Sequence, residues 1–234
     1  MLQPVSGPFA QSLGLIFLGV LLVSAIGPAE PLIWALENLL VLVVAGLLYA
    51  YRATLTFSRP SWVMLFAFLS AHELGAHYTY SQVPYDAWLR ALTGLSLQEQ
   101  LGIERNHFDR AMHFAFGLLL TQPIREVLLR TTPLHRNWSY VLPVALSMAA
   151  SSGYEIIEWL AAATFGEEQG AAFIGAQGDI WDAQKDMVLA AGGAAVAMIV
   201  AAWVERGALP DLIGSAATLR RGLGLSLGQR SPLR

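Results

Sequence analysis

The chain has 234 residues and a formal net charge of −3, with 55% hydrophobic residues, 13% charged residues and a mean hydropathy of +0.51. Soluble domains are less apolar and more highly charged, so this composition predicts an integral membrane protein. The absence of cysteine excludes disulfides, cysteine-ligated zinc and thiol catalysis, and the negative net charge gives no support to nucleic-acid binding.

Apolar segments long enough to cross a bilayer follow one another along the chain. A transmembrane helix needs about 20 predominantly apolar residues, and six segments meet this requirement. No Lys or Arg precedes the first of them and no small-residue cleavage site follows it, so we expect a membrane span there and not a secretory signal. The six segments are residues 12–28, 31–51, 60–82, 108–129, 138–165 and 181–204.

The connections between these segments are short, and no internal repeat divides the chain. We therefore predict an all-α fold, a polytopic membrane helix bundle of about six transmembrane helices. These helices are expected to form a single transmembrane domain over residues 1–204. Residues 205–234, rich in Gly, Ser and Arg, are expected to form a solvated, Arg-rich cytoplasmic tail.

The arginines indicate the orientation, because basic residues in short loops stay on the cytoplasmic side of the membrane. Arg52 and Arg59 flank the second connection, and Arg130 and Arg136 flank the fourth. Further arginines lie in the tail. This distribution predicts that both termini are cytoplasmic and that the protein lies in the bacterial inner (cytoplasmic) membrane.

Four of the predicted spans carry several ionisable side chains in the halves that the orientation makes outer, periplasmic halves. Isolated ionisable groups are costly in lipid and are expected to face the interior of a bundle, toward one another. In chain order the groups are His72, Glu73, His77, Asp109, His113, Glu155, Glu158, Asp182, Lys185 and Asp186.

The spacing of these residues supports the same conclusion. Residues three or four apart share one face of a helix, and each span carries such a pair. We therefore expect four polar faces at one depth to meet in one site near the periplasmic surface. The pairs are Glu73/His77, Asp109/His113, Glu155/Glu158 and Asp182/Asp186.

The residue types indicate a divalent metal. Carboxylate oxygens and imidazole nitrogens are ligands of zinc, iron or manganese, and a buried excess of carboxylates needs protons, cations or a metal to balance it. Glu73 and His77 are expected to act together, with His72 turned toward a neighbouring helix or supporting the ligands. The predicted metal-binding residues are His72, His77, Asp109, His113, Glu158, Asp182 and Asp186, and the predicted catalytic residues are Glu73, Glu155 and Lys185.

Lys185 is the single lysine beside thirteen arginines. Because a buried lysine can lose its proton, Lys185 is a candidate general base or proton carrier. The alternative is a structural ion pair with Asp182 or Asp186. By contrast, we expect only snorkelling and an ordinary ion pair from Arg125, Glu126 and Arg130 at the inner end of the fourth span.

Two features are expected at the outer surface. Tyr78, Tyr80, Tyr85 and Trp88 follow the outer end of the third span, where Tyr and Trp commonly mark the interface. Segment 87–97 is mildly amphipathic, which is compatible with a helix lying flat on the outer surface.

Four ordered motifs carry a resemblance to a known family. "HELGAHYTYSQVPYD", "ERNHFDRAMHFAFGLLL", "SSGYEIIEW" and "GDIWDAQKDM", at these separations, resemble the YjdF-like family of bacterial inner-membrane proteins over roughly residues 60–200. The resemblance implies a membrane location and groups the motifs, and it implies no activity. A looser likeness to VanZ-like membrane proteins, which are linked to glycopeptide resistance, rests on polar motifs in apolar helices.

Three classes of function fit these observations. The first is a membrane-embedded, metal-dependent hydrolase or oxidoreductase that acts on a lipid or lipid-linked substrate. The second is a proton- or ion-coupled transporter or an ion-binding protein without catalysis, which the lack of ionisable residues in the inner halves disfavours. The third is a structural protein held together by a polar network, which the excess of acids over bases disfavours.

Overall fold

The computed structural model is helical throughout the part of the chain that it describes, which is residues 7–52, 54–134, 137–165, 170 and 173–222. No strand occurs among these residues. The α-helices are α1 (Gly7–Ser24), α2 (Pro31–Ala50), α3 (Arg59–Tyr78), α4 (Tyr85–Thr93), α5 (Leu97–Leu101), α6 (Phe108–Thr131), α7 (Trp138–Phe165) and α9 (Asp182–Gly222), and the short 3-10 helix η1 spans Tyr80–Gln82.

Four of these helices, α1, α2, α7 and α9, are long and apolar enough to cross a membrane. Helices α3 and α6 have 20 and 24 residues, and ionisable side chains make them more polar. The protein is therefore a helical membrane protein with several spans. That α3 and α6 also span the bilayer, and that both termini are cytoplasmic, stay predictions.

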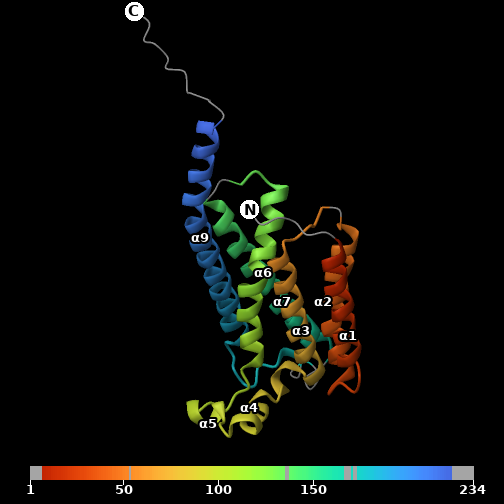
Figure 1. Cartoon of the computed structure of the whole chain (residues 1–234). Coiled ribbons are helices and arrows are strands. Elements are labelled where there is room, and N and C mark those ends of the chain that lie inside the picture. The colour runs from red at the N-terminus through yellow and green to blue at the C-terminus, as the bar shows by residue number, and fades with distance from the viewer. Residues whose placement is uncertain (1–6, 53, 135–136, 166–169, 171–172, 223–234) are drawn as a thin grey trace, which may run out of the picture. The chain divides into compact units, whose positions relative to one another are not determined.

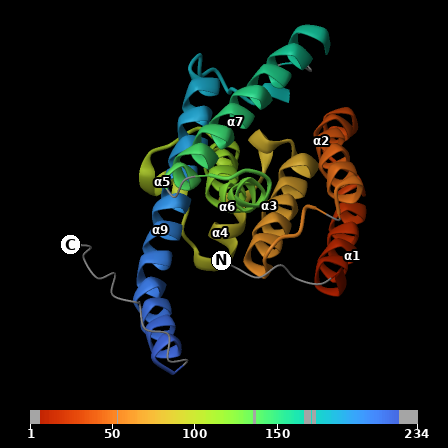
Figure 2. The same ribbon diagram turned by 90° about the horizontal axis from the view of Figure 1, so that it is seen from above.

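The compact unit of the structure covers Met1–Met198. Within it the long helices run side by side, and α4 and α5 lie across one end of the bundle (Figure 1). Seen from above, α3 and α6 lie between α1 and α2 on one side and α7 and the first part of α9 on the other (Figure 2). In agreement, α6 packs against α3 and α7, and α3 packs against α1 and α2.

A second unit, Ile199–Arg234, consists of the rest of α9 and the C-terminal residues. Helix α9 continues to Gly222, so the first part of the predicted tail is helical. Its Ala, Leu and Arg residues favour this conformation. Residues 223–234, the last part of the predicted tail, lie outside the described residues.

Two glycines allow α6 and α9 to approach closely. A Cβ atom on Gly117 of α6 would lie 1.9 Å from the carbonyl oxygen of Ala190, and a Cβ on Gly193 of α9 would lie 2.1 Å from the carbonyl oxygen of Phe114. No larger residue fits at either position without moving a helix backbone. Small residues at such crossings are typical of membrane helix pairs, which associate through close packing.

Glu126 fastens the beginning of α3 to α6. Its carboxylate accepts hydrogen bonds from the Ser58 amide (2.8 Å), the Ser58 hydroxyl (2.5 Å) and the Ser61 hydroxyl (2.8 Å), and it lies 3.6 Å from Arg130. These donors belong to the N-terminus of α3, where a negative charge is favourable. The expected ion pair of this segment is present between Glu126 and Arg130, but the Glu126 carboxylate is buried, does not snorkel, and serves as a helix cap.

Arg125 is also buried and does not snorkel as expected. Its Nε donates to the carbonyl oxygen of Ser139 at 2.9 Å, and its guanidinium lies over the ring of Tyr140, 4.3 Å from the centroid. Arg125 thereby ties α6 to the beginning of α7. The sequence offered no signal for these partners, which belong to a different helix.

Candidate functional site

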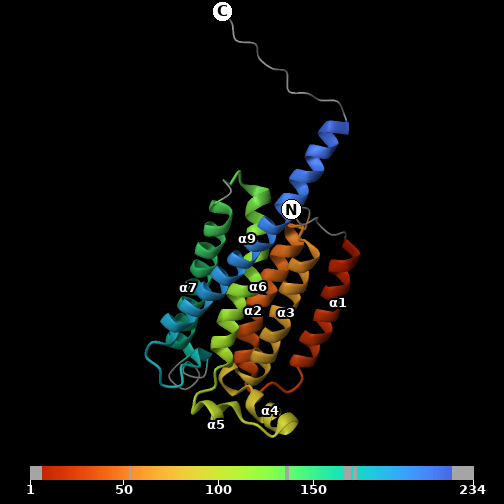
Figure 3. The ribbon, with the colours of Figure 1, turned by 60° about the vertical axis from the view of Figure 1, so that its left-hand side comes forward.

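The polar groups of the helices gather at one end of the bundle. Figure 3 shows this end, where α3 and α7 finish, α6 and α9 begin, and α4 and α5 lie across it. The expectation of a buried cluster of acids and imidazoles is confirmed, although the Glu73/His77 pair of α3 does not join the triad described below. The buried members of the cluster are Glu37, His72, Glu73, Asp109, His113, Glu158, Asp182 and Asp186.

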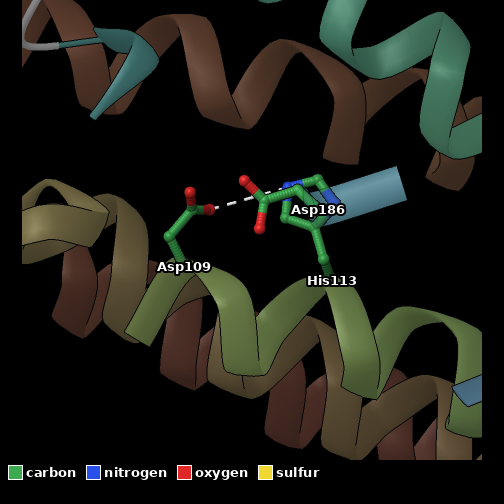
Figure 4. Close-up of side chains that lie close together, drawn as sticks. All are labelled: Asp109, His113 and Asp186. Carbon is green, nitrogen blue, oxygen red and sulfur yellow. Dashed lines mark ion pairs between the residues drawn. The ribbon is translucent and has the colours of Figure 1, made fainter. Parts of the chain in front are cut away.

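Three side chains in this cluster have the geometry of a metal site. Asp109, His113 and Asp186 each present a ligand atom, and these three atoms lie within 4.8 Å of one another. Figure 4 shows Asp109 and His113 projecting from the same side of α6, with Asp186 beside them. All three residues are buried, and Oδ1 of Asp186 has no hydrogen-bond partner within the described chain.

The close crossing of α6 and α9 positions this group. Asp109, His113 and Gly117 follow one another at intervals of four residues and therefore share a face of α6. Asp186 and Ala190 share a face of α9 for the same reason. Gly117 lies against Ala190. His113 is one turn before Gly117 on α6, and Asp186 is one turn before Ala190 on α9. The contact therefore brings Asp186 close to His113.

Glu155 and Ser151 of α7 complete the surroundings of His113. Nε2 of His113 lies 3.6 Å from Oδ1 of Asp109 and 3.5 Å from Oε1 of Glu155, and the Ser151 hydroxyl lies 3.4 Å from Nδ1. Two ligands of a tetrahedral zinc ion, with bonds of about 2.1 Å, stand about 3.4 Å apart. The separations around Nε2 are close to that value and long for hydrogen bonds.

A network of ion pairs borders the triad. Arg105 lies 2.6 Å from Oδ1 of Asp182, and Arg110 contacts both Asp179 and Asp182, the latter at 3.2 Å. Asp182 is thus held by two guanidinium groups, while its neighbour one turn along α9, Asp186, faces the triad. Arg105 lies in the connection that precedes α6, and only the fold reveals its partner.

Lys185 pairs with a different residue from the one expected. Its ammonium group lies 2.5 Å from Oδ2 of Asp179, and none of the ion pairs found among the described residues joins the half-exposed Lys185 to Asp182 or Asp186. This hydrogen bond from Lys185, with the Trp181 amide and Arg110, holds the pKa of Asp179 well below its usual range. This contact is a structural ion pair with a residue other than the expected Asp182 or Asp186. Lys185 itself is half-exposed and does not belong to the buried cluster.

A second group of polar residues joins α1, α2 and α3. The Ser24 hydroxyl donates to Oε2 of Glu73 at 2.5 Å and accepts from Nε1 of Trp34 at 3.1 Å. Nδ1 of His77 donates to the Ser24 carbonyl oxygen at 2.8 Å. Glu73 and His77 therefore share a face, as predicted, but this face is directed at the end of α1 and away from the triad of Asp109, His113 and Asp186.

Two tyrosines form hydrogen bonds with buried members of the cluster. The Tyr154 hydroxyl of α7 donates to Glu37 of α2 at 2.8 Å. The ring of Tyr80, expected at the interface, instead folds back onto Gly75, where a Cβ would lie 2.8 Å away, and its hydroxyl is hydrogen-bonded to Nδ1 of His72. His72 is thus turned toward η1.

The structure brings together part of the predicted site. Of the predicted metal ligands, Asp109, His113 and Asp186 form the triad. Glu158 is buried on α7, one helical turn from Glu155, and is not part of the triad. His72, His77 and Asp182 lie in the adjoining contacts described above.

The apolar helices and the buried acidic and histidine cluster define a multi-pass membrane protein with a polar site inside its helix bundle. Residues 9–207 match the family model described as "Predicted membrane protein (DUF2238)", and the chain belongs to this family. It is also similar to the inner membrane protein YjdF of Escherichia coli (strain K12), with 34% identity over 182 residues, which cover 77% of this chain and 82% of that protein. No solved structure matches. The protein is therefore located in the bacterial inner membrane.

Proposed function

We propose that the protein binds a divalent metal ion inside the membrane and uses the ion to hydrolyse a lipid or a lipid-linked substrate. The observation that carries the proposal is the triad of Asp109, His113 and Asp186, with the unpartnered oxygen of Asp186 inside it. A buried carboxylate oxygen without a partner is costly, and a metal ion removes that cost.

The neighbouring residues supply the other requirements of metal-assisted hydrolysis. A bound zinc, iron or manganese ion polarises a substrate carbonyl or phosphoryl group and activates water. Glu155 lies beside His113 and completes the ligand set or accepts the proton from that water. Of the three catalytic residues predicted from sequence, Glu155 is the one that lies at the triad.

The position of the site favours a substrate that resides in the membrane. The triad lies at one end of a bundle whose outer surface carries many exposed apolar side chains, such as Leu42, Trp159 and Val188. Arg105 and Arg110 border the triad and would attract an anionic headgroup, although both also pair with acids. We place this end of the bundle on the periplasmic side, following the distribution of arginines.

Metal analysis of the detergent-purified protein tests the proposal. The wild type and His77→Ala are expected to carry about one divalent transition metal ion per chain, and His113→Ala and Asp186→Asn are expected to lose it. His77→Ala is the matched control, because it removes an imidazole at the same end of the bundle but outside the triad. A metal-free wild type, after growth with added zinc, iron and manganese, would overturn the proposal.

Catalysis is measured separately on the metal-loaded protein. Inner-membrane lipids are incubated with it, and released headgroups are followed by mass spectrometry. Glu155→Gln should slow their release at least about 100-fold, since general acid–base catalysis contributes roughly that much. Release at the same rate from Asp186→Asn protein would show that the triad is not the catalytic centre.

A further inference from the structure

The group of polar residues between α1, α2 and α3 contains buried oxygens that nothing satisfies. Oε1 of Glu73 and Oδ1 of Asn38 have no hydrogen-bond partner among the described residues, and the side chains are 1% and 5% exposed. The amide group of Asn38 interacts with the Glu73 carboxyl and also donates to the carbonyl oxygen of Trp34 at 3.0 Å. Both unpartnered oxygens accept hydrogen bonds and cannot satisfy each other while Glu73 is ionised.

The charge of Glu73 is also unbalanced. None of the ion pairs among the described residues involves this carboxylate. Helix α1 ends at Ser24, whose hydroxyl donates to Glu73, so the carboxylate lies at a helix C-terminus. That end carries a partial negative charge, which disfavours a second negative charge and attracts a cation.

Glu37 also lies near enough for its charge to interact with that of Glu73, but only Glu73 has a carboxylate oxygen without a partner among the described residues of this group. Glu37 and Asn38 are neighbours in sequence and therefore point about 100° apart on α2. Glu37 is directed to Tyr154 of α7, whereas Asn38 lies beside Glu73. One unpartnered carboxylate oxygen beside neutral oxygens matches a cation of charge +1, and hard oxygen ligands match an alkali ion better than a transition metal.

We infer that Glu73, Asn38 and Ser24 form a binding site for a monovalent cation, sodium, at the C-terminal end of α1. Oε1 of Glu73, Oδ1 of Asn38 and the Ser24 hydroxyl oxygen are the protein ligands. Helix C-termini and oxygen side chains coordinate sodium in the same way in transporters. This site lies apart from the triad and does not depend on it.

A proton on Glu73 is the competing occupant. A protonated Oε1 could donate to Oδ1 of Asn38 and would satisfy both atoms. The two occupants differ in their response to sodium, because a proton leaves no room for a ligand at Oε1. A bound ion raises the thermal midpoint of unfolding in a saturable way, while a proton-filled site gives no specific response.

The experiment is a thermal-unfolding titration of the purified protein with sodium chloride against choline chloride at constant ionic strength, in the presence of EDTA. The wild-type midpoint should rise with sodium and saturate. Glu73→Gln should lose this response and keep its divalent metal when EDTA is omitted. Asp186→Asn should behave in the opposite way, so that this site and the triad are tested independently.

Asn38→Ala provides a second variant that keeps the carboxylate. It should retain a sodium response with an affinity weakened on the order of tenfold, as expected for the loss of one supporting ligand. A wild-type midpoint that responds equally to sodium and choline would overturn the inference, and so would a normal sodium response in Glu73→Gln.

Discussion

Replacing Gly193 by alanine adds one methyl group at the point where α9 lies against α6. The new Cβ would stand 2.1 Å from the carbonyl oxygen of Phe114, and real Cβ contacts essentially never fall below 3.0 Å. The two helix backbones must therefore separate by nearly 1 Å. Overpacking of this kind costs about 1–3 kcal/mol, and the separation exceeds the roughly 0.5 Å within which a site must be held.

Gly192 is the matched control, because it lies next to Gly193 in the same helix. A Cβ at Gly192 meets nothing within 4 Å. Both alanine variants gain the same roughly 0.5–1 kcal/mol of helix propensity, so the difference between them isolates the packing. Gly192→Ala should raise the thermal midpoint of the detergent-solubilised protein slightly, and Gly193→Ala should unfold about 1–3 kcal/mol more easily than Gly192→Ala.

Circular dichroism at 222 nm, recorded on heating, gives both midpoints. The same pair should also differ in metal content, because Asp186 lies two helical turns before Gly193 and moves with it. Equal midpoints for the two variants would refute the reasoning, since they would show that α6 and α9 do not touch at Gly193.

Two further predictions concern the carboxylates of Glu126, which caps α3, and of Asp86 in α4. Glu126→Ala leaves the donors of Ser58 and Ser61 unpaired and should cost about 2–4 kcal/mol in chemical unfolding, whereas Glu99→Ala, at a 72% exposed side chain, should change the unfolding free energy by less than about 0.5 kcal/mol. For Asp86, hydrogen bonds from the Ser96 hydroxyl and the amides of residues 97 and 98 lower its pKa from 3.8, so its contribution to stability is present above pH 3.8 and is lost as the pH falls through the lower pKa of the folded state. Stability measured against pH should therefore fall less steeply below pH 3.8 in Asp86→Asn than in the wild type, and parallel curves would contradict the assignment.

The helices and the polar face that each of them carries could be predicted because both follow from local spacing. Asp109 and His113, four residues apart, had to share a face whatever the fold. What Glu73 and His77 contact could not be predicted, since it depends on where α1 ends relative to α3. Sequence spacing gives the face of each helix but not the rotation of one helix against its neighbour.

The partner of a charged residue could not be predicted either where the two residues lie far apart in the sequence. Arg105 meets Asp182 across 77 positions of the chain, and Glu126 meets Ser58 across 68. A single sequence contains no signal for such pairs. The glycines at the α6–α9 crossing were the missed local clue, because Gly117 continues the spacing of Asp109 and His113 by one more turn.

Helix α3 is held at both ends by hydrogen bonds of buried carboxylates, one from α6 and one from α3 itself. At its start it is bonded to Glu126 of α6, and near its end Glu73 holds the last residue of α1. Sliding or tilting α3 would break one of these attachments, so α3 is held in position at both ends. Any motion that admits a ligand to the buried groups must then come from helices other than α3, and a motion of α1 would have to break the contacts of Ser24 with Glu73 and His77.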